Sequence, residues 1–287
     1  MELSSLRALV QVARNHSFSL AAEAIFITQP ALSKRNATLD ADLQAPQFDR
    51  VGRQVLLTEA GRQLLPRAEQ ILEDMADIRR ELANLSGQVS GTLSMGTSHH
   101  IGLHRLPPLL KRYCHHHPEV KLDIHFMGSE KACGLVEQGE LELGVVTLPP
   151  QPTDNLQLRT VWQDPLRFTV AADHPLAQRG AVQPQELIGY PAVLPTRSTY
   201  TRSLVEEAFA PIGGEIICEI STNYLETLKM MASIGLGWSL LPEIMLDDGL
   251  VSLEVTGIRL ERQLGLVSHR QRTLSNAASA MIAQLTQ

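Results

Sequence analysis

Cysteines and long apolar runs are scarce in this sequence of 287 residues. The three cysteines are an odd number at wide spacing with no Cys-x-x-Cys pair, so we expect no disulfide framework and a reducing compartment. No apolar run approaches the roughly 18–20 residues of a membrane helix. The N-terminus also lacks a basic segment followed by an apolar one, so no export signal is expected. These absences predict a cytoplasmic protein with no membrane partner.

Motifs of the common enzyme classes are missing as well. The sequence contains no Gly-x-Ser-x-Gly elbow, His-Glu-x-x-His helix, Walker loop, or Gly-x-Gly-x-x-Gly turn after a strand. We therefore expect no catalytic residues, no cofactor and no enzyme activity. An enzyme built on an α/β body is the most distant alternative.

The chain is long enough for more than one domain, and its charge is unevenly distributed. Its length and its 44% of apolar residues suit roughly two domains of about 100–200 residues each, plus a smaller module. The net charge is −6, yet residues 1–67 carry 8 Lys/Arg against 6 Asp/Glu, whereas residues 68–287 carry 17 against 25. This asymmetry indicates that only the N-terminal part approaches an anionic polymer.

The N-terminal part has the pattern of three short helices followed by a basic hairpin. Apolar residues recur at helical spacing over residues 3–13, and a second helix is expected over 20–25. Thr28 is a good N-cap for a third helix over about 29–43, and Pro30 falls in its first turn, where the missing N–H costs little.

Two helices joined by a short turn match the geometry of a helix-turn-helix, in which the start of the second helix enters the major groove of DNA. Residues 49–55 indicate a wing, formed by a tight turn between two short strands. The DNA-binding residues that we predict are Thr28, Gln29, Pro30, Ser33, Lys34 and Arg35 on the third helix, with Arg50 and Arg53 of the wing on phosphates. The alternative is a packed helix with a solvated polar face.

Four short motifs make the sequence similar to LysR-type transcriptional regulators. They are Ala21-Ala22-Glu23, Thr28-Gln29-Pro30-Ala31-Leu32-Ser33, Phe48-Asp49-Arg50 and Leu57-Thr58-Glu59-Ala60-Gly61. The resemblance implies a winged helix-turn-helix at residues 1–58 (the head), a linker and dimerisation helix at 59–88, and an effector-binding domain at 91–287 (the body). It also implies a sequence-specific regulator that forms a dimer or tetramer, binds an inverted-repeat operator in double-stranded DNA and contacts RNA polymerase.

Two positions of the head depart from the pattern of this family. Asn36 stands where the family usually has an aliphatic residue, on the same stripe as Leu32 and Leu39. Gln47 stands where a large apolar residue usually precedes Phe48. Because an unpaired buried amide costs about 1–3 kcal/mol, we expect either a less stable head or a partner for Asn36, such as Gln47. These departures motivate the main alternative, a solute-binding or metal-sensing module whose head no longer binds DNA.

A strict apolar repeat runs through the linker helix. Its members step by 4, 3, 4, 3, 4 and 3 residues, and they are Leu64, Ala68, Ile71, Met75, Ile78, Leu82 and Leu85. A period of 3.5 residues is that of a coiled-coil seam, so we predict that these residues dimerise the chain. Pro66 is expected to bend the first part of the helix. The alternative is a helix that lies on its own domain.

The body alternates strand and helix patterns in two units. Strands and helices alternate over about 91–160, which indicates a parallel sheet with helices on its faces, and a second unit follows over about 161–267. The tail at 268–287 returns to the first lobe. The expected fold class is therefore α/β, with a winged helix-turn-helix, a long linker helix and a two-lobed effector-binding domain.

Hydroxyl-rich loops follow several predicted strands of the body. In such sheets ligands bind at the carboxyl ends of the strands, where helix N-termini present free N–H groups, and the resemblance implies the same role here. The predicted effector-binding residues are Thr97, Ser98, His99, Gly128, Ser129, Thr196, Arg197, Ser198, Thr199, Asn223 and Tyr224. Hydroxyls and an arginine suit a small anionic metabolite. The alternative for each serine or threonine is a plain helix cap.

Seven of the ten histidines lie between residues 99 and 125, which raises the question of a metal site. They are His99, His100, His104, His115, His116, His117 and His125. One predicted helix ending before Pro118 would put the triplet at 115–117 about 20 Å from His99 and His100, too far for a shared site. We therefore predict no metal, with metal sensing as the minority alternative.

Overall fold

The computed structural model describes residues 1–51, 54–151 and 153–286, with the backbone alone at Arg50, Val51 and Gln54. The chain divides into two compact units, Met1–Ser86 and Gly87–Gln287. None of the helices within the described ranges combines the length and the apolar character needed to cross a lipid bilayer.

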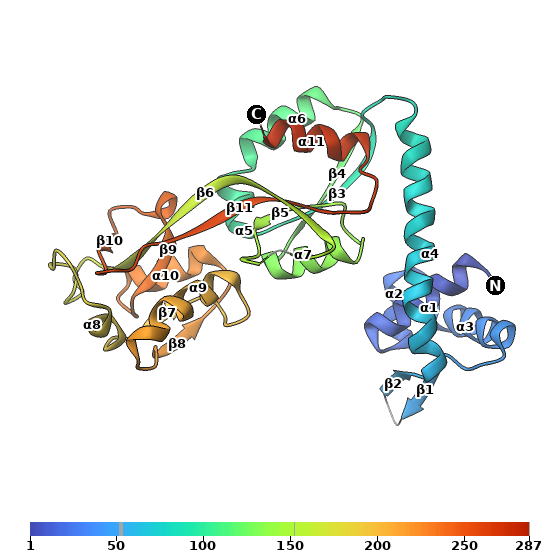
Figure 1. Ribbon diagram of the computed structural model, residues 1–287, viewed down its shortest axis with the longest axis horizontal. Coiled ribbons are helices and arrows are strands. Elements are labelled where there is room, and N and C mark those ends of the chain that lie inside the picture. The colour runs from blue at the N-terminus through green and yellow to red at the C-terminus, as the bar shows by residue number, and fades with distance from the viewer. Residues whose placement is uncertain (52–53, 152, 287) are drawn as a thin grey trace. The chain divides into compact units, whose positions relative to one another are not determined.

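In the first unit, the described residues form three short helices, a hairpin and a long helix (Figure 1). The elements are α1 (Leu3–Asn15), α2 (Phe18–Ala24), α3 (Gln29–Leu43), β1 (Phe48–Val51), β2 (Gln54–Leu57) and α4 (Glu59–Asn84). The hairpin strands are antiparallel. Apolar stripes at helical spacing produce the core: Leu6 and Leu9 of α1 and Leu32 and Leu39 of α3 are at most 1% exposed.

The apolar repeat of α4 is buried in the core of the first unit near its start and exposed to solvent near its end. Ala68 is fully buried and packs with Leu64 against α1 of the same chain. Farther along the helix, Ile78, Leu82 and Leu85 are 49%, 63% and 82% exposed. The prediction of a dimer contact is therefore wrong for Ala68, because the core of its own unit already covers that side chain.

The second unit is built around a mixed sheet, which has seven strands within the described residues. Its order is β10-β6-β11-β5-β3-β4, and β9 also pairs with β6. The strands are β3 (Gly91–Thr97), β4 (Val120–Phe126), β5 (Leu143–Thr147), β6 (Leu156–Ala171), β9 (Ser239–Pro242), β10 (Leu250–Leu253) and β11 (Leu260–His269). β3 is parallel to β4 and β5, whereas β6 and β11 are antiparallel to their neighbours.

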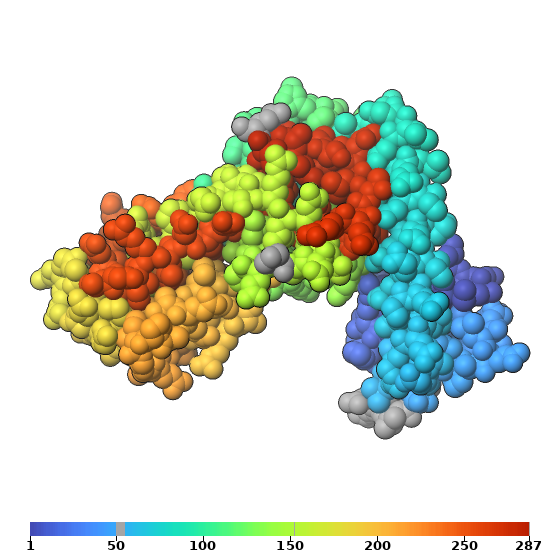
Figure 2. Space-filling model, viewed as in Figure 1, coloured from blue at the N-terminus to red at the C-terminus, as the bar shows by residue number. Residues whose placement is uncertain are grey.

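Helices pack on both faces of the first lobe's part of this sheet. They are α5 (His99–His104), α6 (Pro107–His116), α7 (Ser129–Glu137) and α11 (Asn276–Leu285). Neighbouring residues of β5 point to opposite faces, so Val145 joins the core beneath α11 and Val146 joins the core beneath α7. Tyr113 of α6 donates from its hydroxyl to Ala277 O at 2.7 Å. The C-terminal helix thus packs beside α6 in the first lobe, as its red residues show in Figure 2.

The second lobe adds helices around a short parallel strand pair. The strands are β7 (Ala192–Leu194) and β8 (Cys218–Ser221), and the helices are α8 (Pro184–Ile188), α9 (Tyr200–Phe209) and α10 (Leu225–Ser233), with 3-10 turns at Ala210–Ile212 and Glu243–Met245. The core of this lobe centres on the fully buried Trp238, which packs on Phe168 and Phe209.

Two long paired strands run through both lobes. β6 has 16 residues, so the lobe border predicted near residue 161 falls inside a strand. β6 pairs with β11 around a bulge between Leu264 and Gly265. A Cβ atom at Gly265 would lie 2.1 Å from Arg159 O, so a side chain does not fit there. Continuous strands, rather than loops, connect the lobes.

The single helix predicted to end before Pro118 is two helices. α5 ends at His104 and α6 begins at Pro107. Pro107 and Pro108 lack the N–H groups that would bond to the preceding turn, so the first helix stops. The prediction of one helix is therefore wrong. The distance of about 20 Å between His99 or His100 and the triplet at 115–117 assumed that single helix, so it no longer argues against a metal site.

Candidate functional site

The first turns of α3 present a polar surface to solvent. Of the predicted DNA-binding residues on this helix, Thr28, Gln29, Pro30 and Lys34 are exposed and Ser33 and Arg35 are partly exposed. Gln29 Nε2 donates to Ser33 Oγ at 3.1 Å, which aligns the amide along the helix. Among the described residues, neither Lys34 nor Arg35 has an ion-pair partner. Their charges are therefore available to an anionic partner.

The hairpin of β1 and β2 has the geometry of a wing. Phe48 pairs with Leu57 across it, and the Phe48 ring packs edge-on against Phe18 of α2 at 5.7 Å. This contact attaches the hairpin to the helices. Arg50 lies in β1, where its backbone alone is described, and Arg53 lies outside the described residues.

The turn between α2 and α3 carries an aromatic side chain that the sequence analysis missed. Phe26 is 96% exposed, and its φ of 56° lies in the left-handed region, which costs a residue with a side chain about 1–2 kcal/mol. Phe26 lies two residues before Thr28, the N-cap of α3, so an almost uncovered ring stands in the turn of the helix-turn-helix. The signal in the sequence was the run of three apolar residues at 25–27, inside a turn.

Asn36 and Gln47 are both buried, and each keeps one oxygen without a partner. Asn36 Nδ2 donates to Asp40 Oδ2 at 3.1 Å, and Gln47 N donates to Asp40 Oδ1 at 2.9 Å. Asn36 Oδ1 and Gln47 Oε1 have no hydrogen-bond partner among the described residues. Pairing of Asn36 with Gln47 is therefore wrong, because the Asn36 amide donates to Asp40, whereas the Gln47 amide donates from Nε2 to Ala45 O at 2.6 Å. Burial raises the pKa of this carboxyl, while the bond from Gln47 N acts against the rise.

A cleft of about 380 Å³ lies between the two lobes of the second unit. Its lining contains eight of the eleven predicted residues, namely Ser98, His99, Gly128, Ser129, Thr196, Thr199, Asn223 and Tyr224. They follow the carboxyl ends of β3, β4, β7 and β8. Strand ends from both lobes thus meet at one cavity, which is where ligands bind in α/β sheets.

Three predicted residues are not part of this lining. Thr97 is fully buried in β3, where its hydroxyl donates to a backbone oxygen of β5 at 2.8 Å. The Arg197 side chain is 72% exposed and forms ion pairs with two glutamates outside the cleft. Ser198 is exposed and shares a hydrogen bond with Thr196. The prediction that these three line the cleft is wrong, because strand pleating and loop geometry direct alternate residues away from it.

A buried ion pair adjoins the cleft, and the sequence analysis missed it. Asp164 is 1% exposed and accepts from Arg262 Nε at 2.8 Å and from Arg105 Nη2 at 3.4 Å. Arg262, which lines the cleft, also donates from Nη1 to Thr201 Oγ1 at 2.8 Å. Burial lowers the pKa of Arg262 and the Asp164 carboxylate opposes this, so the guanidinium stays charged. No local pattern marks these positions, because β6, β11 and α9 bring them together.

Several polar groups of the lining already have structural partners. Thr199 caps α9 and Ser98 caps α5, as the plain-cap alternative predicts. Ser129 Oγ accepts from a backbone N–H of β5 at 3.0 Å. Glu130 of α7 accepts from Tyr200 N at 2.7 Å, so a carboxylate of the first lobe already stands at the N-terminus of α9.

Aromatic rings from both lobes form another part of the wall. The His99 ring lies 4.8 Å from the Tyr224 ring of the second lobe and 5.3 Å from the Phe126 ring of the first, centroid to centroid. All three residues line the cleft. The cavity therefore offers a flat, partly apolar surface beside its hydroxyls and charges.

A group of possible metal ligands lies at the same border. His100, His104 and Glu226 offer ligand atoms that are all within 4.8 Å of one another. The sequence analysis predicts no metal site. The long separation behind that prediction involves the triplet at 115–117, which takes no part in this group.

Comparison with known proteins gives matches over nearly the whole chain. Residues 3–62 match the family described as "Bacterial regulatory helix-turn-helix protein, lysR family", and residues 86–287 match "LysR substrate binding domain". The uncharacterized HTH-type transcriptional regulator YfeR of Shigella flexneri is 31% identical over 285 residues, covering 97% of this chain and 91% of its own.

Solved structures agree in fold. Full-length OxyR from Pseudomonas aeruginosa has a TM-score of 0.69 at 23% identity, covering 100% of this chain and 98% of its own. Full-length CbnR complexed with its target DNA has a TM-score of 0.62 at 17% identity, covering 99% of each chain. Each likeness therefore extends over both units of this chain. The chain therefore belongs to the LysR family, whose members are DNA-binding transcriptional regulators with an effector-binding domain and not enzymes.

Proposed function

We propose that this regulator responds to a small anionic metabolite held between the lobes of the body. The observation that carries the proposal is Arg262, a buried cation on the wall of a hydroxyl-rich cleft. A guanidinium has five N–H donors, and Asp164 and Thr201 use one each. The remaining donors suit a carboxylate or another oxyanion.

The charges around the cleft limit how much negative charge a ligand can carry. Asp164 already balances Arg262, and Glu130 adds a second carboxylate at the lining. A polyanion would meet this charge at close range in a partly dry cavity, where repulsion is strong. We therefore expect a monoanion whose hydroxyl or amide groups bond to Thr196, Asn223 and their neighbours.

We further propose that two chains read an inverted repeat through paired heads. Gln29, Ser33, Lys34 and Arg35 would contact bases and nearby phosphates, with Thr28 and Pro30 shaping the start of α3 and with Arg50 and Arg53 on phosphates. Ile78, Leu82 and Leu85, which are exposed, would join the two linker helices, together with the partly exposed Met75. Such a dimer, or a tetramer of two dimers, would contact RNA polymerase from the operator in the cytoplasm.

Ligand binding would act on the DNA complex through the lobes. An effector shifts an equilibrium only by its difference in affinity for two states. A ligand that contacts Ser129 in the first lobe and Asn223 in the second binds the closed body more tightly than the open one. The spacing of the paired heads, rather than their overall affinity, is the quantity that this closure would change.

The test is stabilisation of the full chain by a panel of small carboxylic acids, each compared with its own amide in thermal unfolding. We expect at least one acid, but not its amide, to raise the unfolding temperature of the body. Arg262→Lys should weaken that acid at least tenfold, because the planar donor fork is lost. Arg197→Ala is the matched control, and it should change nothing. Equal stabilisation by acids and amides, or equal loss in both variants, contradicts an anionic effector bound at Arg262.

A further inference from the structure

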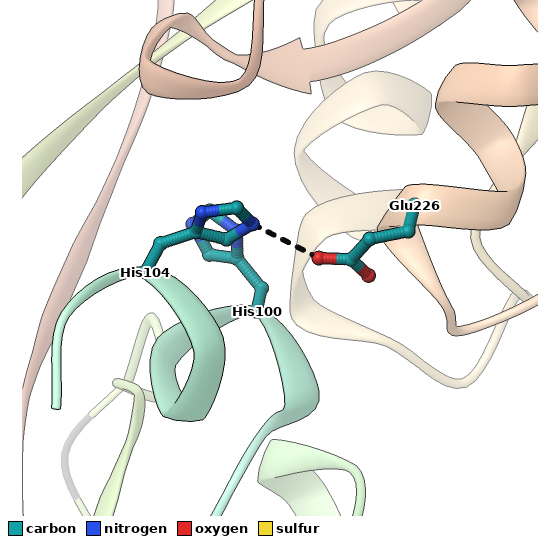
Figure 3. A group of neighbouring side chains, drawn as sticks. All are labelled: His100, His104 and Glu226. Carbon is teal, nitrogen blue, oxygen red and sulfur yellow. Dashed lines mark hydrogen bonds and ion pairs between the residues drawn. The ribbon is translucent and has the colours of Figure 1, made fainter. Parts of the chain in front are cut away.

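Three metal-ligating side chains meet where α5 of the first lobe faces α10 of the second. His100 and His104 are four residues apart on α5, a spacing that puts both rings on one face of a helix. Glu226 lies in the first turn of α10. The two imidazole centroids are 5.1 Å apart, and Figure 3 shows the carboxylate of Glu226 pointing toward the rings, which overlap in this view.

The spacing of the ligand atoms is close to that of a coordinated ion. His104 Nε2 and Glu226 Oε1 are 3.1 Å apart, and the three ligand atoms lie within 4.8 Å of one another. Bonds of about 2.0–2.1 Å in a tetrahedral zinc site put neighbouring ligand atoms about 3.3 Å apart. His104 Nε2 and Glu226 Oε1 already have about this separation, and the His100 nitrogen is at most about 1.5 Å too far from either atom.

His100 gives an independent reason to expect a ligand. Its side chain is 3% exposed, yet neither ring nitrogen has a hydrogen-bond partner among the described residues. A buried polar group left unpaired costs about 1–3 kcal/mol. The His100 ring therefore lacks a partner that the described side chains do not supply.

We propose that His100, His104 and Glu226 form a site for a divalent transition metal, with Zn²⁺ as the expected ion. Two imidazoles and one carboxylate are a ligand set that zinc accepts, with a fourth position open to water. Calcium and magnesium prefer oxygen ligands. Asp164 lies 3.9 Å from His100 Nε2 and partly balances the arginines behind the ring.

A metal ion at this position would link the two lobes. α5 and α10 belong to different lobes, so one ion bound to both fixes the distance between them. His100 also lines the effector cleft, so the link lies directly beside the ligand. Metal occupancy would thus favour the closed body. A metal link of this kind would act whatever ligand the cleft binds, so it does not depend on the effector being an anion.

The experiment is a calorimetric titration of Zn²⁺ alone into the untagged, chelator-treated full chain. We expect one ion per chain with a dissociation constant of about 1 µM or below. His104→Ala and Glu226→Gln should each weaken binding at least tenfold. Both side chains are about one-third exposed, at 34% and 39%, so these variants should keep their folds, which circular dichroism checks. The matched control replaces His115, His116 and His117 with alanine together, and it should still bind the ion.

Co²⁺ provides a second measurement. Its visible spectrum changes only if His100, His104 and Glu226 bind the ion, and not if they merely stabilise the fold. Tetrahedral Co²⁺ absorbs visible light far more strongly than hydrated Co²⁺, so the loaded chain should show this band and Glu226→Gln should lose it. No bound ion at about 0.1 mM Zn²⁺ would overturn the proposal. So would an ion that stays in His104→Ala and Glu226→Gln but is lost from the triple variant.

Discussion

The head and the body each bury a cluster of polar side chains, and the two clusters differ in how fully they are hydrogen-bonded. In the head, the Asn36 amide and the Gln47 backbone N–H both donate to Asp40, and the Asn36 and Gln47 side chains each keep a buried oxygen without a partner among the described residues. In the body, Asp164 accepts from Arg262, which donates in turn to Thr201, so these three side chains satisfy one another. The atoms left without a partner among the described residues lie beside this trio, at Arg105 Nε and on the His100 ring. Burial of polar groups is tolerated only when their partners are buried with them. The first cluster therefore weakens its unit, whereas the second joins β6, β11 and α9 beside the effector cleft.

The largest effect is expected from breaking the body's cluster. Asp164→Ala leaves Arg262 and Arg105 without their shared carboxylate, and an unpaired buried charge costs about 3–5 kcal/mol. Urea unfolding of the full chain should show this loss in the transition of the body. Glu243→Ala is the control, because it breaks the exposed Arg167–Glu243 pair, which contributes less than about 1 kcal/mol. Equal losses in the two variants would contradict the assigned importance of burial.

The head's cluster should respond in the opposite direction. Asn36→Leu removes an unpaired buried oxygen and fills the apolar stripe of α3, so we expect a gain of about 1–3 kcal/mol in the free energy of unfolding of the head. Water can replace the lost donor at the partly exposed Asp40. Thr38→Leu places the same side chain on the exposed face of α3 and should give no gain. An unchanged midpoint for Asn36→Leu would show that the orphan oxygen costs nothing.

A smaller gain is expected at the turn before α3. Phe26→Asn relieves a left-handed backbone conformation, since asparagine tolerates positive φ, and should stabilise the head by about 1 kcal/mol. Phe26→Ala removes the same ring but keeps the strain, so its unfolding temperature should stay near that of the wild type. If alanine stabilises the head as much as asparagine does, exposure of the ring and not the backbone is the cause.

The smallest effect is a pH dependence of the head. The raised pKa of Asp40 means that the folded state holds this proton more tightly than the unfolded state does. The head should therefore gain stability as the pH falls through the folded pKa, with the full gain present below the ordinary value of 3.8. Thermal unfolding of wild type and Asp40→Asn between pH 7 and pH 4 isolates this contribution. A wild-type head that loses stability relative to the variant over this range would refute the sign.

Features that depend on neighbouring residues in the sequence could be predicted. The bounds of α3 follow from Thr28, Pro30 and a leucine stripe within 16 residues, so local chemistry is enough to place the helix. Eight cleft residues were also predictable, because each follows the carboxyl end of a parallel strand, β3 or β4 in the first lobe and β7 or β8 in the separate sheet of the second.

Interactions between distant segments could not be predicted. Arg262 and Asp164 are 98 positions apart, and the register of β6 against β11 brings them together. Glu226 reaches His104 over 122 positions because of how the two lobes meet. In both cases the partner is set by tertiary packing, which leaves no periodic signal in the sequence.

We expect the head to read a specific DNA sequence despite its strained turn and the two buried amide oxygens that lack partners. Fluorescence anisotropy tests this most directly, with the full chain titrated against DNA from upstream of its own gene and against a scrambled duplex, over a series of salt concentrations. We predict tighter binding to the upstream DNA at every salt concentration, and loss of that preference in Gln29→Ala/Arg35→Ala with only salt-sensitive binding left. Equal affinity of the wild type for both duplexes, or an unchanged preference in the double variant, would contradict the account.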